Sequence, residues 1–371
     1  MAIEPKSPDE LASALAEAAN QQRSIRLVGR GTKDGMGGPL AAAGAEITTR
    51  ALNRLLKYEP RDLTISVEAG MRWKDLNALL ERNGQMIPLD PPFSGEATVG
   101  GVIATNSSGP RRRLYGTARD MVIGMSFATL EGKVVETGGM VVKNVAGLDM
   151  GKLMIGSFGT LAAVTSVNFR VYPRPPATRT FRWSFSTSAA ALIRRDSILR
   201  GVLQPMAVDL RKSADGFVLM LEAGGSAAIL DRYSRELSGA EILEERSAQE
   251  AWREMRQFTP FWLLRHPEGA VARVSTVLSE VGNVMDSLPA PAIARAGNGV
   301  CYGYFTAAEQ ASEWFAAHRE ARGVIEYAPR DFRERGELWW GPGQDFSIMQ
   351  KIKSLFDSGN LLNRGRLYGR L

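Results

Sequence analysis

Cysteine and histidine are scarce in this chain of 371 residues. The single cysteine, Cys301, excludes an internal disulfide, fits a reducing compartment and argues against an iron–sulfur cluster or a cysteine-based zinc site within the chain. We expect Cys301 itself to be a small buried hydrophobe. The only two histidines, His266 and His318, exclude a histidine-rich metal centre. We therefore predict that this chain holds no metal.

The chain also lacks long apolar runs and one-sided charge. No apolar run reaches the ~20 residues that a membrane helix needs, and the acidic N-terminus, MAIEPKSPDELASALAEAA, is not a secretory signal. The net charge is +6, but 46 basic residues are scattered among 40 acidic ones, and the only tight basic run is Arg111–Arg113. A solvated face, or one that attracts anions or a partner subunit, is favoured over a nucleic-acid groove. We predict a cytoplasmic protein without an integral membrane segment or a nucleic-acid partner.

The composition and the pattern of apolar and polar residues predict an α+β protein of two lobes. Hydrophobic residues make up 44% and charged residues 23%, which is typical of globular proteins. Patterning predicts helices over 9–22 and 71–84, strands over 24–29, 63–70 and 162–173, and a hairpin over 121–139 that turns at Glu131-Gly132. The prolines at 173, 175 and 176 mark a boundary, beyond which strands and helices alternate as in an α+β sandwich with helices on one face. We predict domains over 1–175 and 176–340 and a C-terminal segment over 341–371.

A first glycine-rich stretch, GRGTKDGMGG (29–38), follows a predicted strand. Gly29 and Gly31 allow backbone N–H groups to turn toward one point, which is how backbones hold phosphates. Thr32 adds a hydroxyl donor, and Arg30 or Lys33 can supply positive charge. The stretch suits a diphosphate, although it matches neither the phosphate loop nor the dinucleotide fingerprint. A plain surface loop is the alternative.

A second stretch, TVGGVIATNSSGPRRRLYG (98–116), contains no acidic side chain and is predicted to be a loop. Gly100 and Gly101 permit close backbone approach, residues 105–108 carry short hydrogen-bonding side chains, and Gly109 ends the run. Buried polar backbone groups need partners from a ligand or from the fold. A flat, polar-edged ligand with a phosphate tail, such as a flavin dinucleotide, would supply them, whereas a solvated loop is the alternative.

The order of these segments resembles the vanillyl-alcohol-oxidase or PCMH type of FAD-binding fold over roughly residues 20–175. The resemblance is carried by IRLVGRGTK, by the stretch from PLDPPFSGEATVGG to KVVETGG, and by KNVAGLDMGKLMIGSFGTLAAVT. The tail FDSGNLLNRGRL is similar to the FDPxGxxNPGR ending of bacterial glycolate oxidase subunits and D-lactate dehydrogenases, with Ser358 and Arg364 in place of two prolines. The resemblance implies two FAD-binding subdomains, a smaller α+β cap domain and a C-terminal segment that returns to the flavin.

The resemblance also implies which residues bind FAD. They come from the first glycine-rich stretch, the second stretch, the GSFGTL turn with the strand that follows it, and the tail: Gly29, Arg30, Gly31, Thr32, Lys33, Thr98, Gly100, Gly101, Thr105, Asn106, Ser108, Gly109, Tyr115, Gly116, Gly156, Gly159, Thr160, Val164 and Asn363. Because the first histidine is His266, the covalent attachment that some members make through a histidine in the first loop is absent, and FAD is predicted to be non-covalent.

One departure concerns the second lobe. Active 2-hydroxyacid dehydrogenases of this group carry a motif like HxGxGNxH, whose histidines bind a divalent metal beside the substrate. Here the nearest stretch is ARAGNGVCYGYF (294–305), with Arg295 and Tyr302 roughly where histidines would lie. Arginine cannot be a metal ligand, so this metal site is expected to be absent. No catalytic residue is assigned. Arg273 and Arg295 are candidate anchors for a substrate carboxylate, with a surface or ion-pair role as the alternative.

This pattern is similar to the FAD-binding E subunit of bacterial glycolate oxidase. The resemblance implies that glycolate, or a similar 2-hydroxyacid, is oxidised to the 2-oxoacid within a complex. The implied partners are a larger FAD-binding catalytic subunit and an iron–sulfur subunit, with peripheral placement at the inner membrane through that complex. A self-sufficient FAD-dependent D-2-hydroxyacid dehydrogenase and a non-catalytic flavin-fold scaffold remain as alternatives.

Overall fold

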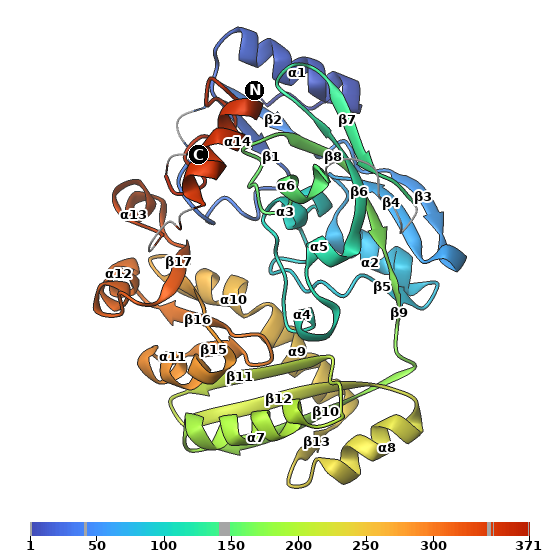
Figure 1. The fold of residues 1–371 in the computed structure, drawn as a ribbon, viewed down its shortest axis with the longest axis vertical. Helices are drawn as coiled ribbons and strands as arrows, with labels where there is room; N and C mark the ends of the chain where they lie inside the picture. Colours follow the sequence, from blue (N-terminus) through green and yellow to red (C-terminus); the bar gives the residue numbers. More distant parts are fainter. Residues whose placement is uncertain (1, 41–42, 141–148, 340–342, 344, 370) are drawn as a thin grey trace. The chain divides into compact units, whose positions relative to one another are not determined.

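A computed structural model describes residues 2–40, 43–140, 149–339, 343, 345–369 and 371. Residues 143–148, which open the KNVAGLDMGKLM motif, lie outside the described residues. Contacts divide the chain into two compact units. Unit 1 combines Met1–Ser107, Thr117–Arg174 and Pro342–Leu371, and unit 2 combines Ser108–Gly116 with Pro175–Gly341 (Figure 1). The C-terminal segment thus belongs to the same unit as the first glycine-rich stretch, while residues 108–116 of the second stretch belong to unit 2.

Unit 1 contains an antiparallel sheet with β8 at its centre. In the described part of the chain its order is β3 (Leu55–Glu59), β4 (Thr64–Glu68), β8 (Ala163–Arg170), β6 (Val122–Ala128) and β7 (Val134–Gly138). Every residue of β4 is buried, whereas β3 lies at the edge and is largely exposed. The β6–β7 hairpin contains Gly132 at φ +78°, a left-handed value that suits glycine and agrees with the predicted turn.

A parallel pair, β1 (Ile25–Val28) and β2 (Ala45–Thr48), lies against the amphipathic helix α1 (Pro8–Asn20). Ser7 caps α1 by accepting a hydrogen bond from the Glu10 N–H. Leu362 forms a parallel bridge with Ile25, so the C-terminal tail lies beside β1. The remaining elements of unit 1 are short: η1 (Pro60–Asp62), α2 (Trp73–Glu81), β5 (Gln85–Met86), α3 (Val99–Ala104), α5 (Ala118–Met121), α6 (Gly151–Met154), β9 (Tyr172–Pro173) and α14 (Phe346–Phe356).

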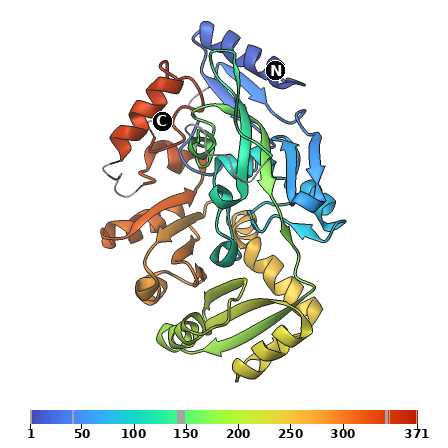
Figure 2. The same cartoon turned by 45° about the vertical axis from the view of Figure 1, so that its right-hand side comes forward.

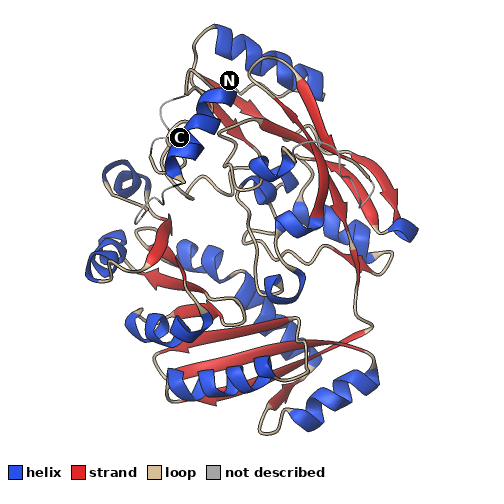
Figure 3. Ribbon diagram, in the orientation of Figure 1, coloured by secondary structure: helices blue, strands red, loops and turns tan. Residues whose placement is uncertain are grey.

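Unit 2 is built on a second antiparallel sheet (Figure 3). Its described strands follow the order β13 (Glu241–Leu243), β10 (Ala177–Phe185), β12 (Gly216–Gly225), β11 (Ala207–Ser213), β15 (Ala292–Arg295), β16 (Val300–Phe305), β14 (Ala270–Ser275) and β17 (Arg322–Tyr327). One face forms the core with α7 (Ser188–Arg200), α8 (Ala227–Glu236), α11 (Val281–Ser287) and α12 (Ala308–Ala317). Unit 2 also contains the short helices α4 (Arg112–Tyr115), η2 (Leu278–Glu280) and α13 (Arg330–Arg335).

The opposite face of this sheet is also covered, by α9 (Glu245–Arg256) and α10 (Phe258–Arg265), drawn in gold in Figure 2. Trp252 of α9 donates a hydrogen bond to the Thr180 hydroxyl at 3.0 Å, and the hydroxyls of Thr259 and Tyr304 lie 3.1 Å apart. The expectation of helices on one face is therefore wrong. Hydroxyl side chains on the second face would lose water on burial, and α9 and α10 supply their partners.

The second glycine-rich stretch is also not a plain loop. Val99–Ala104 form α3, whose N-cap Thr98 accepts a hydrogen bond from the Gly101 N–H. Val99, Val102 and Ile103 are buried at helical spacing. The two glycines have a low helix propensity, and the prediction of a loop is based on them. Burial of these three side chains outweighs that propensity, so the segment forms a helix.

Candidate flavin site

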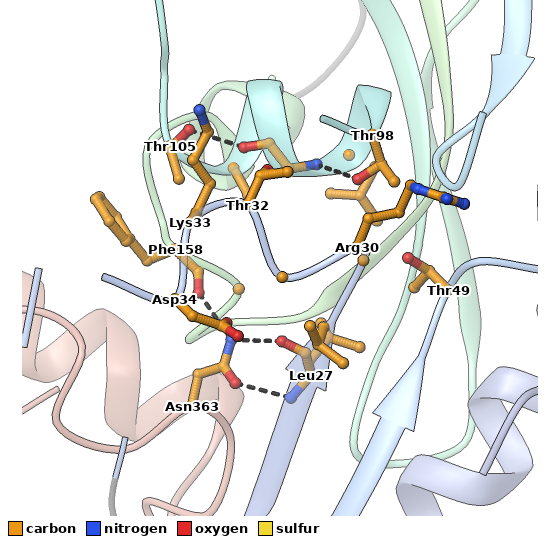
Figure 4. A pocket seen from close by; sticks show the side chains of 18 of the residues that line it. Leu27, Arg30, Thr32, Lys33, Asp34, Thr49, Thr98, Thr105, Phe158 and Asn363 are labelled. Atoms are coloured by element: carbon orange, nitrogen blue, oxygen red, sulfur yellow. Dashed lines mark hydrogen bonds between the residues drawn. The ribbon is translucent and has the colours of Figure 1, made fainter. Parts of the chain in front are cut away.

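A pocket in unit 1 brings the first glycine-rich stretch, α3, the turn before β8 and the C-terminal tail together (Figure 4). The cavity itself measures about 90 Å³, and it opens to solvent. The predicted residues that line it are Gly29, Arg30, Gly31, Thr32, Lys33, Thr98, Gly100, Gly101, Thr105, Gly159, Val164 and Asn363. Segments separated by more than three hundred residues of chain therefore meet at one cavity.

The first stretch leaves β1 at Val28 and enters the pocket with free backbone donors. Within the described part of the chain, the N–H groups of Arg30, Gly31 and Thr32 donate to no protein acceptor. Gly31 has φ +75°, which an L side chain rarely adopts. A Cβ on Gly29 would lie 2.5 Å from the Thr98 hydroxyl oxygen, so glycine is needed where the two stretches touch. The loop thus offers adjacent N–H groups to a ligand or to solvent.

The two cations of this loop contact protein groups. Arg30 Nε lies 3.0 Å from Glu96 Oε2, and Lys33 Nζ donates to the Pro92 carbonyl at 2.9 Å. The Lys33 ammonium also lies 4.9 Å from the centroid of the Phe93 ring. The pKa of Glu96 is held below its usual range, first by a hydrogen bond from Lys74, with Arg30 adding to the effect. Besides these cations, the loop presents backbone N–H groups and the Thr32 hydroxyl to the pocket.

The glycines of α3 differ in what surrounds them. A Cβ on Gly100 would lie 2.9 Å from the Cβ of Ala69, so Gly100 is required by packing. A Cβ on Gly101 would meet only the Thr98 hydroxyl oxygen, at 3.1 Å. Thr105 donates through its hydroxyl to the Gly101 carbonyl at 2.8 Å. The space next to the Gly101 Cα is therefore open to a ligand, whereas the space next to the Gly100 Cα is filled by Ala69.

The turn before β8 is fixed to the end of α3. The Gly156 N–H donates to the Ile103 carbonyl at 3.1 Å, and the Phe158 N–H to the Ala104 carbonyl at 2.8 Å. Gly156 and Gly159 both have positive φ. Thr160, which does not line the pocket, donates through its hydroxyl to the Ser157 carbonyl at 2.7 Å and so shapes the turn.

The other predicted residues are placed outside the pocket lining. Asn106 follows α3 in a left-handed conformation, with φ +48°. Ser108, Gly109, Tyr115 and Gly116 belong to unit 2 by their contacts. Their roles toward FAD stay predictions.

Asn363 holds the tail in place through its side-chain amide. Its Oδ1 accepts from the Leu27 N–H at 2.8 Å, and its Nδ2 donates to the Phe158 carbonyl at 2.8 Å (Figure 4). The amide thus joins β1 to the turn before β8. These protein contacts show how Asn363 shapes the pocket wall.

Sequence reasoning missed two buried cations of the same tail. Arg366 lines the pocket, and its guanidinium donates to carbonyls of the first stretch. Lys353 donates to the carbonyls of Thr160 at 2.7 Å and Leu362 at 3.0 Å, and it pairs with Asp357. Burial lowers the pKa of Lys353, while the Asp357 carboxylate opposes that shift. The arginine that ends the NRGR motif was the available signal for Arg366, and nothing local indicated Lys353.

These features fit FAD. Adjacent free N–H groups suit a diphosphate, Gly101 leaves room beside α3, and Leu27, Phe158 and Val164 give the pocket an apolar wall for a ring system. When bound, FAD supplies a ring that accepts a hydride.

Both candidate carboxylate anchors of unit 2 have acidic neighbours. Arg295, buried on β15, forms an ion pair with Asp209 and lies 5.6 Å from the centroid of the Tyr302 ring. Arg273 Nε lies 3.2 Å from Glu326 Oε1. Burial raises the pKa of Tyr302. Among the described residues, no group of three or more His, Cys, Asp or Glu side chains could hold a metal ion.

Comparison with known proteins gives matches in sequence and in structure. A family model described as "FAD binding domain" matches residues 1–138. Glycolate oxidase subunit GlcE of Escherichia coli is 31% identical over 98% of this chain and 99% of its own length. Glycolate oxidase subunit GlcD of Bacillus subtilis is 30% identical, but over 56% of this chain and 44% of its own length.

Two solved structures share the fold at low sequence identity. p-Cresol methylhydroxylase has a TM-score of 0.76 at 15% identity, covering 98% of this chain and 88% of its own. 4-Ethylphenol oxidase from Gulosibacter chungangensis has a TM-score of 0.75 at 14% identity, covering 100% of this chain and 89% of its own. The predicted fold class is confirmed.

The fold and the family match define an FAD-dependent oxidoreductase of the PCMH type, which confirms the predicted cofactor and enzyme class. Within that class, the chain belongs to the family of the glycolate oxidase subunit GlcE. In the described residues, each helix is too short or too polar to cross a lipid bilayer.

Proposed function

We propose that this chain is the FAD-binding subunit of a complex that oxidises glycolate, or a similar 2-hydroxyacid, to the 2-oxoacid. The observation that carries the proposal is the end-to-end match to GlcE, which covers 98% of this chain and 99% of that subunit. A match confined to the FAD-binding half would support the cofactor but not the subunit role.

The chain's own residues hold and orient the cofactor in this proposal. The N–H groups of Arg30, Gly31 and Thr32 bind the diphosphate, and α3 approaches the cofactor closely at Gly101. Asn363 keeps the tail against β1 so that the pocket keeps its shape. We propose that attachment is non-covalent, because the residues that line the pocket include no histidine, cysteine or tyrosine to form a bond to the flavin.

The partners in this proposal are a larger FAD-binding catalytic subunit and an iron–sulfur subunit. The shared sequence with GlcD, over 56% of this chain, supports a partner built on the same FAD-binding half. The iron–sulfur partner is proposed from the resemblance to glycolate oxidase subunits, and the single cysteine of this chain cannot itself ligate a cluster. We place the complex in the cytoplasm, peripheral at the inner membrane, as part of the same proposal.

The test compares the isolated chain with the assembled complex. The chain is purified alone, and also co-expressed with the two proposed partners, a GlcD-like flavoprotein and a cysteine-rich iron–sulfur chain from the same genome. Each sample receives glycolate or D-lactate and a dye acceptor, and flavin content is measured in parallel. We expect bound FAD in both samples and turnover only in the complex.

Two outcomes would replace the proposal. Rapid turnover by the isolated chain would identify a self-sufficient 2-hydroxyacid dehydrogenase. A purified chain that is colourless after incubation with excess FAD and removal of the unbound FAD by gel filtration would identify a scaffold.

A further inference from the structure

A single arginine of the C-terminal tail, Arg366, contacts several carbonyl groups of the first glycine-rich stretch. Arg366 is 6% exposed and lines the pocket. Its Nη1 donates to the Met36 carbonyl at 2.6 Å and the Asp34 carbonyl at 3.1 Å, and its Nη2 donates to the Lys33 carbonyl at 2.9 Å. One guanidinium therefore fixes the middle of the stretch, residues 33–36.

These contacts hold consecutive turns in place. The Asp34 N–H donates to the Gly31 carbonyl at 3.0 Å, and the Met36 N–H donates to the Lys33 carbonyl at 3.0 Å. The Lys33 carbonyl thus joins a turn of the loop to Arg366. Because the planar guanidinium presents its donors in a fixed fork, it can hold several carbonyls at defined positions, which a flexible ammonium does less well.

Arg366 also brings buried positive charge to the pocket wall. Asp34 Oδ1 lies 4.0 Å from Arg366 Nη2. The other carboxylate oxygen, Asp34 Oδ2, lies 2.6 Å from Arg26 Nη2. A guanidinium that has exchanged water mainly for carbonyl dipoles is stabilised further by an anion nearby. The pocket lies beside this charge, and a diphosphate carries two negative charges.

We propose that Arg366 is a positioning residue for the diphosphate of FAD: it fixes the loop that offers the N–H groups and places a buried positive charge behind that loop. The proposal rests on FAD as the cofactor and not on the substrate, so loss of the glycolate proposal would leave it standing. Arg30 and Lys33 contact Glu96 and the Pro92 carbonyl. In this proposal, Arg366 of the C-terminal tail supplies positive charge at the loop.

The experiment measures the dissociation constant for FAD, by quenching of flavin fluorescence, and the melting temperature of the apoprotein. Arg366→Gln is expected to weaken FAD binding about 10–100-fold, the effect of losing a charged hydrogen-bonding group. Arg366→Lys keeps the charge without the fork, and is expected to bind FAD several-fold more tightly than Arg366→Gln. Arg364→Gln, a change of the same charge at an exposed position of the same tail, is the matched control and should stay within about twofold of wild type.

A second variant protects the test against misfolding of the Arg366 variants. Asp34→Asn removes the negative charge near the guanidinium and keeps the side-chain shape, so the positive charge at the pocket increases. We expect FAD binding to tighten about two- to fivefold, since removing one partly exposed charge is worth a fraction of a kcal/mol to about 1 kcal/mol. The proposal is overturned if Arg366→Lys binds FAD no better than Arg366→Gln, or if Asp34→Asn leaves the dissociation constant unchanged.

Discussion

Replacing Gly101 by valine should separate cofactor binding from folding. Gly101 is in the first turn of α3 with an ordinary helical backbone, and a Cβ there meets only the Thr98 hydroxyl oxygen at 3.1 Å. Valine favours a helix over glycine by only about a few tenths of a kcal/mol, so the apoprotein should melt close to the wild-type temperature. The added methyl groups extend into the space beside α3 that the pocket provides.

The expected loss of FAD affinity follows from the same geometry. If valine keeps the diphosphate from one backbone N–H, the lost interaction is worth about 1.5–3 kcal/mol, or about 10–150-fold in the dissociation constant. The assay is the ratio of flavin to protein after gel filtration, followed by titration of the apoprotein with FAD. A Gly101→Val protein that retains stoichiometric flavin would refute the placement of FAD beside α3.

Gly100→Val is the matched control, one residue away in the same helix. Its Cβ would lie 2.9 Å from the Cβ of Ala69 and 3.2 Å from the Ala69 carbonyl oxygen. Overpacking of this kind costs about 1–3 kcal/mol of stability, so this apoprotein should melt at a lower temperature. Equal destabilisation by both variants would show that the distinction between the two glycines is wrong.

Two further predictions concern unit 2. Burial raises the pKa of the Cys301 thiol from 9.0 to about 12, so the folded state retains a proton that the unfolded state loses, and the free energy of unfolding should fall as the pH rises from 9 toward 12. Iodoacetamide at pH 8.5 should therefore leave the native thiol unmodified by mass spectrometry and label it fully in guanidinium chloride; equal labelling rates would contradict its burial. Arg295→Met removes the guanidinium beside the fully buried Asp209 and should cost about 3–5 kcal/mol in denaturant unfolding, whereas Arg273→Met, at a part-exposed pair with Glu326, should cost about 0–1 kcal/mol. Similar losses of unfolding free energy in the two variants would mean that burial does not determine how much each ion pair stabilises the protein.

Local patterns were sufficient for several elements. Helix α1 follows its apolar spacing and its Ser7 cap, and the β6–β7 hairpin follows alternating residues around Glu131-Gly132. Where a local pattern competed with burial, the sequence misled. The glycines in TVGGVIA predict a loop, yet Val99, Val102 and Ile103 bury a helical face. The sequence shows that these three residues are apolar. The free energy gained by burying them depends on neighbours that are distant in the chain, so the local pattern could not predict the helix.

By itself, the sequence determined the two glycine-rich stretches, their small hydroxyl side chains and their order along the chain, and these features led to the prediction that both stretches serve one flavin. Only the tertiary structure decided which groups face the cavity. Arg30 and Lys33 contact Glu96 and Pro92, and Arg366 reaches a loop 330 residues earlier in the chain, at the Met36 carbonyl. Ion pairs and buried hydrogen bonds form between whichever groups the fold brings within about 3 Å, and sequence separation carries no information on that distance.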